Sequence, residues 1–144
     1  MDSVPGEVGF LCEDLRSSVE DPHETWQLLL RIGAKFSVSI DGRTLYSEED
    51  FPVVELASYS ESWMGGDQSD FLFLSMESDE SPLLGFYYES SGFFRAYSPH
   101  QFFAAAATIK RDVLIGSLQE FNRGLGQCVA SELRLDISAV LRGA

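Results

Sequence analysis

The chain has 144 residues, of which 44% are hydrophobic and 23% charged, as in one folded domain rather than a disordered segment. Acidic residues outnumber Lys and Arg by 23 to 10, so the net charge is −13 and the isoelectric point is near 4.3. This balance disfavours nucleic acids and anionic membranes, because both bind basic surfaces. We expect a single domain over residues 1–144 that binds neither, with residues 1–7 as a loose N-terminal end.

The negative charge is concentrated in the first two thirds of the chain. Residues 1–90 carry 19 of the 23 acids and only four of the ten basic residues. Three clusters account for much of it: Glu20, Asp21 and Glu24; Glu48, Glu49 and Asp50; and Glu77, Asp79 and Glu80. One explanation is solubility, since surplus carboxylates keep copies of a small domain apart. The other is an electronegative face that speeds association with a basic partner.

The two cysteines, Cys12 and Cys128, lie far apart in the sequence and belong to no C-x-x-C motif. A disulfide-stabilised secreted domain needs more of them, and the first twenty residues show no basic segment followed by an apolar core. We therefore expect the reducing cytoplasm as the location. Acidic residues follow Cys12 directly, so we expect an inert, buried thiol there.

The first predicted element is a strand over residues 8–15. The segment 21–33 then gives two signals. Residues 21–24 match a capping box that opens a helix, which Gly33 would end. The apolar residues of the same segment alternate with polar ones, as in a strand. The pattern leaves both structures open.

A hairpin is predicted next, because two alternating runs flank the two-residue loop Asp41–Gly42. This loop sets Val38 opposite Leu45. Two residues further along, Phe36 lies opposite Ser47. The apolar side of one strand thereby meets a compatible side of the other.

A short helix is predicted from about Asp50 to Met64. Pro52 suits its first turn, the preceding acids suit its positive end, and Gly65–Gly66 end it. Glu55 lies between two apolar residues on this helix. If it points inward it must be hydrogen-bonded or protonated, and if it points outward it is an ordinary surface carboxylate.

From residue 70 onward turn residues separate three apolar runs, which predicts an antiparallel meander. Its strands are 71–76, 83–88 and 93–97. A second capping box at 98–101 opens a long amphipathic helix that runs to Gly124 or Gly126. The tail over 128–142 fits a helix and a strand equally well.

Together these elements predict an α+β fold. An antiparallel β-sheet of five to six strands carries the short helix and the long C-terminal helix, packed mainly on one face.

No motif for catalysis stands out. His23 and His100 are the only histidines, and a zinc site needs three or four ligands at recognisable spacing. The chain has no Gly-x-Ser-x-Gly elbow, and Gly65–Gly66 lack the Lys-Ser/Thr of a phosphate loop. The acids of residues 67–80 do not have the spacing of a calcium loop. We therefore expect no enzyme, metal or cofactor, with a carboxylate-based enzyme as the third hypothesis.

The order of the elements resembles a known group of proteins. A hairpin over 36–46 precedes Phe51-Pro-Val-Val-Glu-Leu-Ala57, which leads to Trp63. Asp70-Phe71, Ser75-Met76-Glu77 and a second hairpin follow, and Ser98-x-x-x-Phe102 opens the long helix. Over residues 26–125 this is similar to small bacterial α+β proteins related to the immunity proteins of polymorphic toxin systems. The resemblance implies a non-enzymatic inhibitor that binds a toxin domain and blocks its active site.

A toxin that acts on nucleic acid would carry a basic cleft, which an acidic surface complements. We predict such a surface with Trp63 as its apolar anchor, although the pattern favours a place at the edge of the core for this residue. The predicted partner-binding residues are Glu48, Glu49, Asp50, Glu61, Trp63, Asp67, Asp70, Glu77, Asp79 and Glu80. The alternative is a structural or regulatory domain that self-associates through a sheet edge or Ala104–Ala107.

Overall fold

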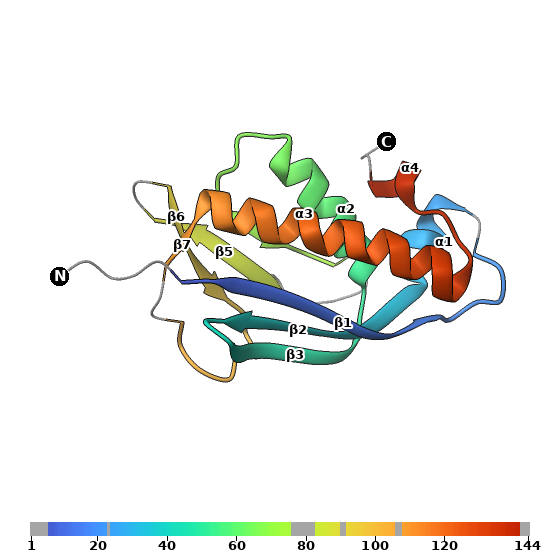
Figure 1. Ribbon diagram of the computed structural model, residues 1–144, viewed down its shortest axis with the longest axis horizontal. Helices are drawn as coiled ribbons and strands as arrows, with labels where there is room; N and C mark the ends of the chain where they lie inside the picture. Colours follow the sequence, from blue (N-terminus) through green and yellow to red (C-terminus); the bar gives the residue numbers. More distant parts are fainter. Residues whose placement is uncertain (1–5, 23, 76–82, 90–91, 106–107, 142–144) are drawn as a thin grey trace.

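The computed structural model describes residues 6–22, 24–75, 83–89, 92–105 and 108–141 (Figure 1). The fold is α+β, as predicted, but its strands form two antiparallel sheets of three and four strands rather than one sheet of five or six. The long helix α3 (Arg111–Cys128) lies against the first sheet and extends along most of the molecule. None of the helices in the described part of the chain is long and apolar enough to cross a membrane.

The first sheet has the order β1-β2-β3, with β1 (Val8–Ser17), β2 (Ile32–Ile40) and β3 (Arg43–Phe51). Every second residue of β2 is buried, as the alternating sequence predicts. The hairpin loop is confirmed: Asp41 and Gly42 have φ angles of 54° and 81°, which a two-residue turn of the I′ type requires.

The predicted register of this hairpin is wrong by one residue. Val38 pairs with Tyr46 instead of Leu45, and Phe36 pairs with Glu48 instead of Ser47. The shift arises because Leu45 is an extra residue on β3, a β-bulge. Leu45 and Tyr46 are consecutive and both fully buried, so the bulge turns two neighbouring side chains into the core.

The ambiguous segment 21–33 contains both structures. Helix α1 (Thr25–Leu30) is preceded by Glu24, whose capping box with Gln27 replaces the predicted cap at Asp21. The helix ends at Leu30, Arg31 is its C-cap, and Ile32 begins β2 directly. The amide of Gly6 donates a hydrogen bond to the Thr108 carbonyl, and the amide of Asp41 donates one to the Glu7 carbonyl. Residues 1–5 of the predicted loose end lie outside the described residues.

Helix α2 (Val53–Met64) ends where predicted, with Gly65 after its last residue, but it begins at Val53 rather than near Asp50, so Pro52 precedes the first turn instead of lying in it. The acids Glu48, Glu49 and Asp50 do not cap it, because they belong to β3. The helix contacts β2, β4 and α3, so it packs between the sheets rather than on one face of a single sheet.

The second sheet has the order β4-β5-β6-β7 and contains the predicted meander. Its strands are β4 (Phe71–Phe73), β5 (Leu84–Tyr88), β6 (Phe93–Tyr97) and β7 (Ile109–Lys110). The short strand β7 was predicted as part of the long helix, but it pairs with β6 before the chain turns into α3.

The predicted helix start at Ser98 is also wrong. The capping contacts do form, since Ser98 N donates to Gln101 Oε1 at 3.0 Å and His100 N donates to Ser98 Oγ at 3.3 Å. They close a single turn, because Phe102 N then donates to the Leu45 carbonyl of β3 and not to an earlier carbonyl of its own segment. Residues 98–105 are therefore not helical, and Ala106 and Ala107 lie outside the described residues.

Neither Gly124 nor Gly126 ends α3, which continues to Cys128. The tail, left open between helix and strand, is helical: a π-helical turn η1 (Val129–Leu133) follows directly, and α4 (Ser138–Leu141) comes after it. Arg134 has a φ of 57°, and this left-handed residue ends η1.

Aromatic rings fill the core between the two sheets. Phe36 and Phe51 of the first sheet stack with centroids 4.5 Å apart, and Phe51 contacts Phe73 of the second sheet at 5.6 Å. Phe121 of α3 packs edge-on against Phe36 at 5.7 Å. These contacts join both sheets and the long helix in one apolar cluster.

Candidate protein-interaction surface

The predicted partner-binding acids of the described residues, apart from Glu61 within α2, lie in two groups, one on each side of α2 in the chain. Glu48, Glu49 and Asp50 lie at the end of β3, before α2, whereas Asp67 and Asp70 follow α2 (Figure 1). Twelve helical residues separate the two groups. This is a length of roughly 18 Å. Glu77, Asp79 and Glu80 lie outside the described residues.

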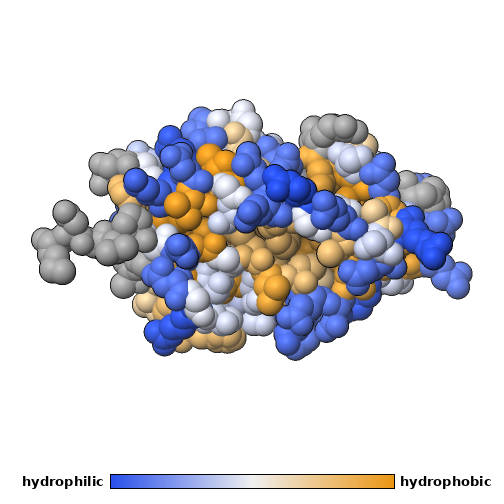
Figure 2. Space-filling model, in the orientation of Figure 1, coloured by the Kyte–Doolittle hydropathy of each residue, from blue (hydrophilic) through white to orange (hydrophobic). Residues whose placement is uncertain are grey.

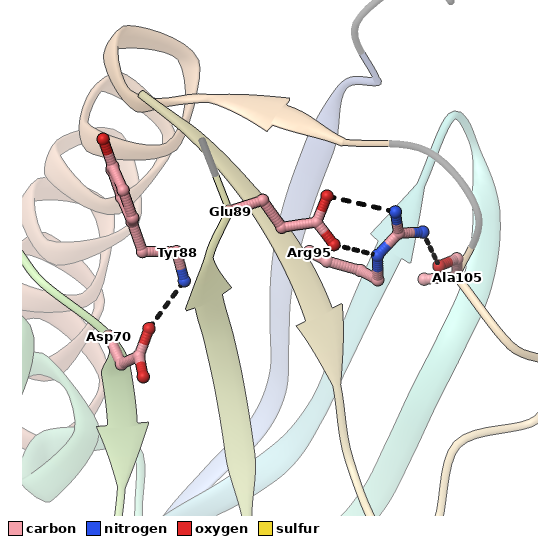
Figure 3. Close-up of polar contacts among 5 residues, drawn as sticks. All are labelled: Asp70, Tyr88, Glu89, Arg95 and Ala105. Carbon is pink, nitrogen blue, oxygen red and sulfur yellow. Dashed lines mark hydrogen bonds and ion pairs between the residues drawn. The ribbon is translucent and has the colours of Figure 1, made fainter. Parts of the chain in front are cut away.

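Asp67 and Asp70 are exposed, and their carboxylates make local backbone contacts. Ser69 donates to Asp67 Oδ1 from its amide at 3.3 Å and from its hydroxyl at 3.1 Å. The amide of Tyr88 donates to Asp70 Oδ1 at 2.7 Å, which joins the start of β4 to the end of β5 (Figure 3). These contacts give both aspartates a role in shaping the chain between α2 and β4.

Glu61 and Trp63 also hold the fold together. Asn122 Nδ2 of α3 donates to Glu61 Oε2 at 2.7 Å, which ties α3 to α2. Trp63 is only 7% exposed, its indole nitrogen donates to the Ser69 carbonyl, and its ring packs on Phe71 at 5.3 Å. Its ring therefore belongs to the core edge, the competing interpretation of this residue, and offers little area to a partner.

A different set of acids does come together. The strands β1 and β3 are both antiparallel to β2, so their carboxyl ends lie at the same end of the first sheet. The chain between β1 and α1 is at this end too, on the right in Figure 1. We name this region the acidic end. Its exposed acids are Glu13, Asp14, Glu20, Asp21, Glu24, Glu48, Glu49 and Asp50.

Three basic residues neutralise part of this charge. Arg16 reaches across β2 and donates from Nη2 to the Glu49 carbonyl at 2.7 Å and to Asp50 Oδ1 at 3.4 Å. The Arg16 side chain crosses β2 at Gly33. A Cβ atom at this position would lie 2.6 Å from Asp50 Oδ1, so a residue with a side chain would crowd the Asp50 carboxylate. The Nζ atom of Lys35 lies 4.0 Å from Oε1 of Glu49. Arg31 is the third basic residue at this end. The paired side chains are 41–83% exposed, so the pairs are weak and the end stays negative.

An exposed tryptophan lies at the same end, on α1. Trp26 is 46% exposed, its Nε1 donates to Glu24 Oε2 at 2.7 Å, and the Arg31 guanidinium lies 5.4 Å from its ring centroid. These contacts hold the ring in place while much of it faces solvent. The sequence pattern did not single it out, because Trp26 continues the apolar alternation of Leu28 and Leu30 and so looks like a core residue. Hydrophilic residues lie at this end of the molecule, as they do over the rest of the face shown in Figure 2.

A cavity of about 630 Å³ adjoins the acidic end. It is lined by residues of both charges, among them Arg16, Arg31, Glu48, Asp50 and His100. Ser75 also lines it, and its hydroxyl donates at 2.8 Å to Glu55, which is 7% exposed. Glu55 thus points inward and is hydrogen-bonded. No three His, Cys, Asp or Glu side chains of the described segments are placed to hold a metal ion.

The two cysteines, far apart in the sequence, lie near each other in the fold. Cys12 of β1 and Cys128 at the end of α3 line one cavity of about 350 Å³ between strand and helix. Burial, and then the neighbouring Cys128 and acids, raise the pKa of the Cys12 thiol to about 11. Cys12 is therefore a neutral thiol at physiological pH, in agreement with its acidic sequence neighbours.

Comparison with known proteins gives one match. No curated protein and no solved structure matches the chain. The model of one family, described as a domain of unknown function (DUF7878), matches residues 13–131. The matched range runs from the second half of β1 through α3 and so includes the acids and the tryptophan of the acidic end. Because this range is most of the sequence, the chain belongs to the DUF7878 family.

Proposed function

We propose that this protein is a non-enzymatic inhibitor of the immunity type, which binds a toxin domain with a basic cleft through the acidic end. The observation that carries the proposal is that eight exposed acids lie at the same end of the molecule as the exposed ring of Trp26. Charged side chains near an exposed aromatic ring are a common composition for a protein interface.

The charge of the acidic end supports a basic partner. Eight carboxylates face three basic side chains there, and the acids are solvent-exposed, so their field extends into solvent over about 8 Å at physiological salt. A field of this sign steers a basic protein toward the surface and raises the association rate. It also competes with phosphate for the same cleft, which is how such a protein would block a nuclease.

Trp26 supplies the apolar part of the surface. Its hydrogen bond to Glu24 and the nearby Arg31 restrict the ring before a partner binds. A ring that is already ordered loses little conformational entropy on binding. Trp26 therefore takes the role that the sequence assigned to Trp63.

The test measures binding to the purified product of the gene immediately upstream, at low and at high salt. The variant is the double reversal Glu48→Lys with Glu49→Lys. Its matched control is Glu7→Lys with Asp112→Lys, which changes the net charge equally at exposed acids just before β1 and at the start of α3, away from the acidic end. We expect the first pair to lower the association rate at low salt about tenfold and the second to change it less than about twofold.

Trp26→Ala tests the anchor separately and should raise the dissociation rate about tenfold, with the thermal melt as a control for folding. Equal effects of the two charge pairs would show that only net charge matters and would contradict the proposal. A salt-insensitive homo-oligomer that ignores the upstream product would favour the self-associating domain instead.

A further inference from the structure

The cavity between β1 and α3 has one cysteine on each of its two walls. Phe10 and Cys12 are two residues apart on β1, so their side chains lie on the same side of the sheet. This side faces α3, because Phe10 packs on Phe121 with ring centroids 5.9 Å apart. Cys128 follows Phe121 by about two helical turns and so lies on the same side of α3. Both thiols therefore face the cavity.

The course of the two walls brings the cysteines to the same end of the cavity. β1 and α3 contact each other and run in the same direction along the molecule (Figure 1). β1 also contacts η1, which begins directly after Cys128. Gly124 lines the cavity about one turn before Cys128, and a Cβ atom there would meet nothing within 4 Å. The helix thus presents no side chain at that turn to separate the two walls.

The electrostatics of Cys12 agree with this placement. Burial is the main cause that raises the pKa of its thiol, and Cys128 is the next, ahead of Glu132 and Glu13. Cys128 can have this effect only if the two sulfurs are close enough for their charges to interact.

The acids around the cavity disfavour a reaction with free cellular thiols. Glu13, Glu120 and Glu132 line the cavity together with the two cysteines. They repel anionic thiols such as glutathione, so a lasting mixed disulfide is unfavourable here. A bond between the two cysteines brings no further negative charge into the cavity.

We propose that Cys12 and Cys128 form a reversible disulfide when hydrogen peroxide oxidises the protein. Cys128 reacts first, because it is exposed at the end of α3. Its thiolate attacks one peroxide oxygen, the O–O bond breaks, and a sulfenic acid forms while the released hydroxide takes up the thiol proton. The Cys12 sulfur then attacks the Cys128 sulfur, the S–O bond breaks, and the Cys12 proton leaves with this hydroxide. Two thiols and one peroxide give one disulfide and two waters.

The disulfide would fix the end of α3 to β1. It closes a loop that contains most of the chain, and a long loop removes much entropy from the unfolded state, so the oxidised protein should be the more stable form. A reducing thiol that attacks the exposed Cys128 sulfur must expel Cys12. Because the pKa of Cys12 is about 11, it leaves slowly, and the disulfide should persist after the peroxide has been consumed.

The experiment treats the folded, full-length protein with hydrogen peroxide and maps its peptides by mass spectrometry without reduction. We expect one cross-linked pair of peptides, which contains Cys12 and Cys128, in a protein that stays monomeric. The intact mass should fall by two hydrogen atoms and be restored by dithiothreitol. Urea unfolding should need more denaturant after oxidation, and Cys128→Ser should show no such shift.

The matched control moves one thiol to the other face of β1. Leu11→Cys combined with Cys12→Ser keeps two cysteines, but residue 11 is 55% exposed and its side chain lies on the face opposite to that of Cys12. We expect this variant to form the intramolecular disulfide at least about tenfold more slowly. In Cys12→Ser alone, Cys128 should stop at the sulfenic acid, which dimedone traps.

Oxidation of wild-type Cys128 without a cross-link to Cys12 would overturn the proposal, and so would equally fast cross-linking in the Leu11→Cys variant. A mixed disulfide with glutathione that persists on wild-type Cys128 would also contradict it, because Cys12 would then fail to reach this sulfur. None of these measurements involves a partner of the acidic end, so this inference and the proposed function are tested separately.

Discussion

At the scale of single residues, the two cysteines have different surroundings, which predicts different reactivities. Cys12 is half-buried between β1 and α3, and its pKa is raised from 9.0 to about 11. Cys128 is exposed at the end of α3. A rise of this size lowers the thiolate fraction of Cys12 near pH 8 about a hundredfold, and only the thiolate reacts with an alkylating reagent.

We therefore expect iodoacetamide at pH 8 to modify Cys128 well before Cys12, by a factor of about ten or more. Mass spectrometry of timed samples measures both rates, and the Cys128→Ser variant isolates Cys12. The rate at Cys12 should rise with pH up to about 11, since its pKa lies there. In denaturant the two should react alike, and equal rates in the folded protein would contradict the assignment.

The two tryptophans show how far a single residue could be predicted. Trp63 was correctly placed at the end of α2, beside Gly65 and Gly66. Its exposure could not be predicted, because that depends on Phe71 and Phe94 of a later sheet. Trp26 lies in a segment whose apolar residues match a helix and a strand equally, so its exposed side was not predictable either. Chain position follows from local sequence, whereas exposure follows from distant residues.

At the scale of elements, the helix starts show why one local signal has two outcomes. Capping contacts form at Glu24 and at Ser98. A helix follows only the first, because the backbone after Ser98 is bonded to β3 and residues 109–110 pair with β6. Capping contacts of the same kind thus begin a helix at one place and close a single turn at the other. Competing long-range hydrogen bonds decide between these two outcomes.

Helix α3 contains glycines in its interior, among them Gly124 and Gly126, where the sequence predicted an end, and Gly116 gives a stability test. A Cβ atom at Gly116 would meet nothing within 4 Å. Gly116→Ala should therefore raise the free energy of unfolding by about 0.5–1 kcal/mol, since alanine is the better helix former. Urea unfolding measures the change.

The control for that substitution is Gly42→Ala in the hairpin loop, where space is also open but φ is +81°. This change should lower the stability by about 1 kcal/mol, because alanine is strained in the left-handed region. A stabilised Gly42→Ala, or a destabilised Gly116→Ala, would contradict the conformations described for these two positions.

At the scale of the whole molecule, Phe51 connects the two sheets. It ends β3, stacks on Phe36 within its own sheet and contacts Phe73 of the other. Its side chain is 1% exposed. Both sheets therefore share a single apolar cluster, which predicts one cooperative unfolding transition.

Phe51→Ala should lower the free energy of unfolding by about 3–5 kcal/mol. Single-tryptophan variants report the two ends: Trp63→Phe leaves Trp26 on α1 beside the first sheet, and Trp26→Phe leaves Trp63 against the second. We expect coincident urea transitions for both reporters, each shifted equally by Phe51→Ala. Two separate transitions would mean that the sheets form two independent units.

The sequence by itself determined the features that depend on neighbouring residues: the α+β class, the Asp41–Gly42 hairpin, the C-terminal end of α2 and the meander over residues 71–97. Only the tertiary structure decided the division into two sheets, the bulge at Leu45 and the start of α3 at Arg111. It also decided which acids share a surface, because β1 and β3 meet at one end only after both pair with β2. Turn and helix signals act over a few residues along the chain. Pairing and burial depend on segments that are distant in sequence and compete for the same partners.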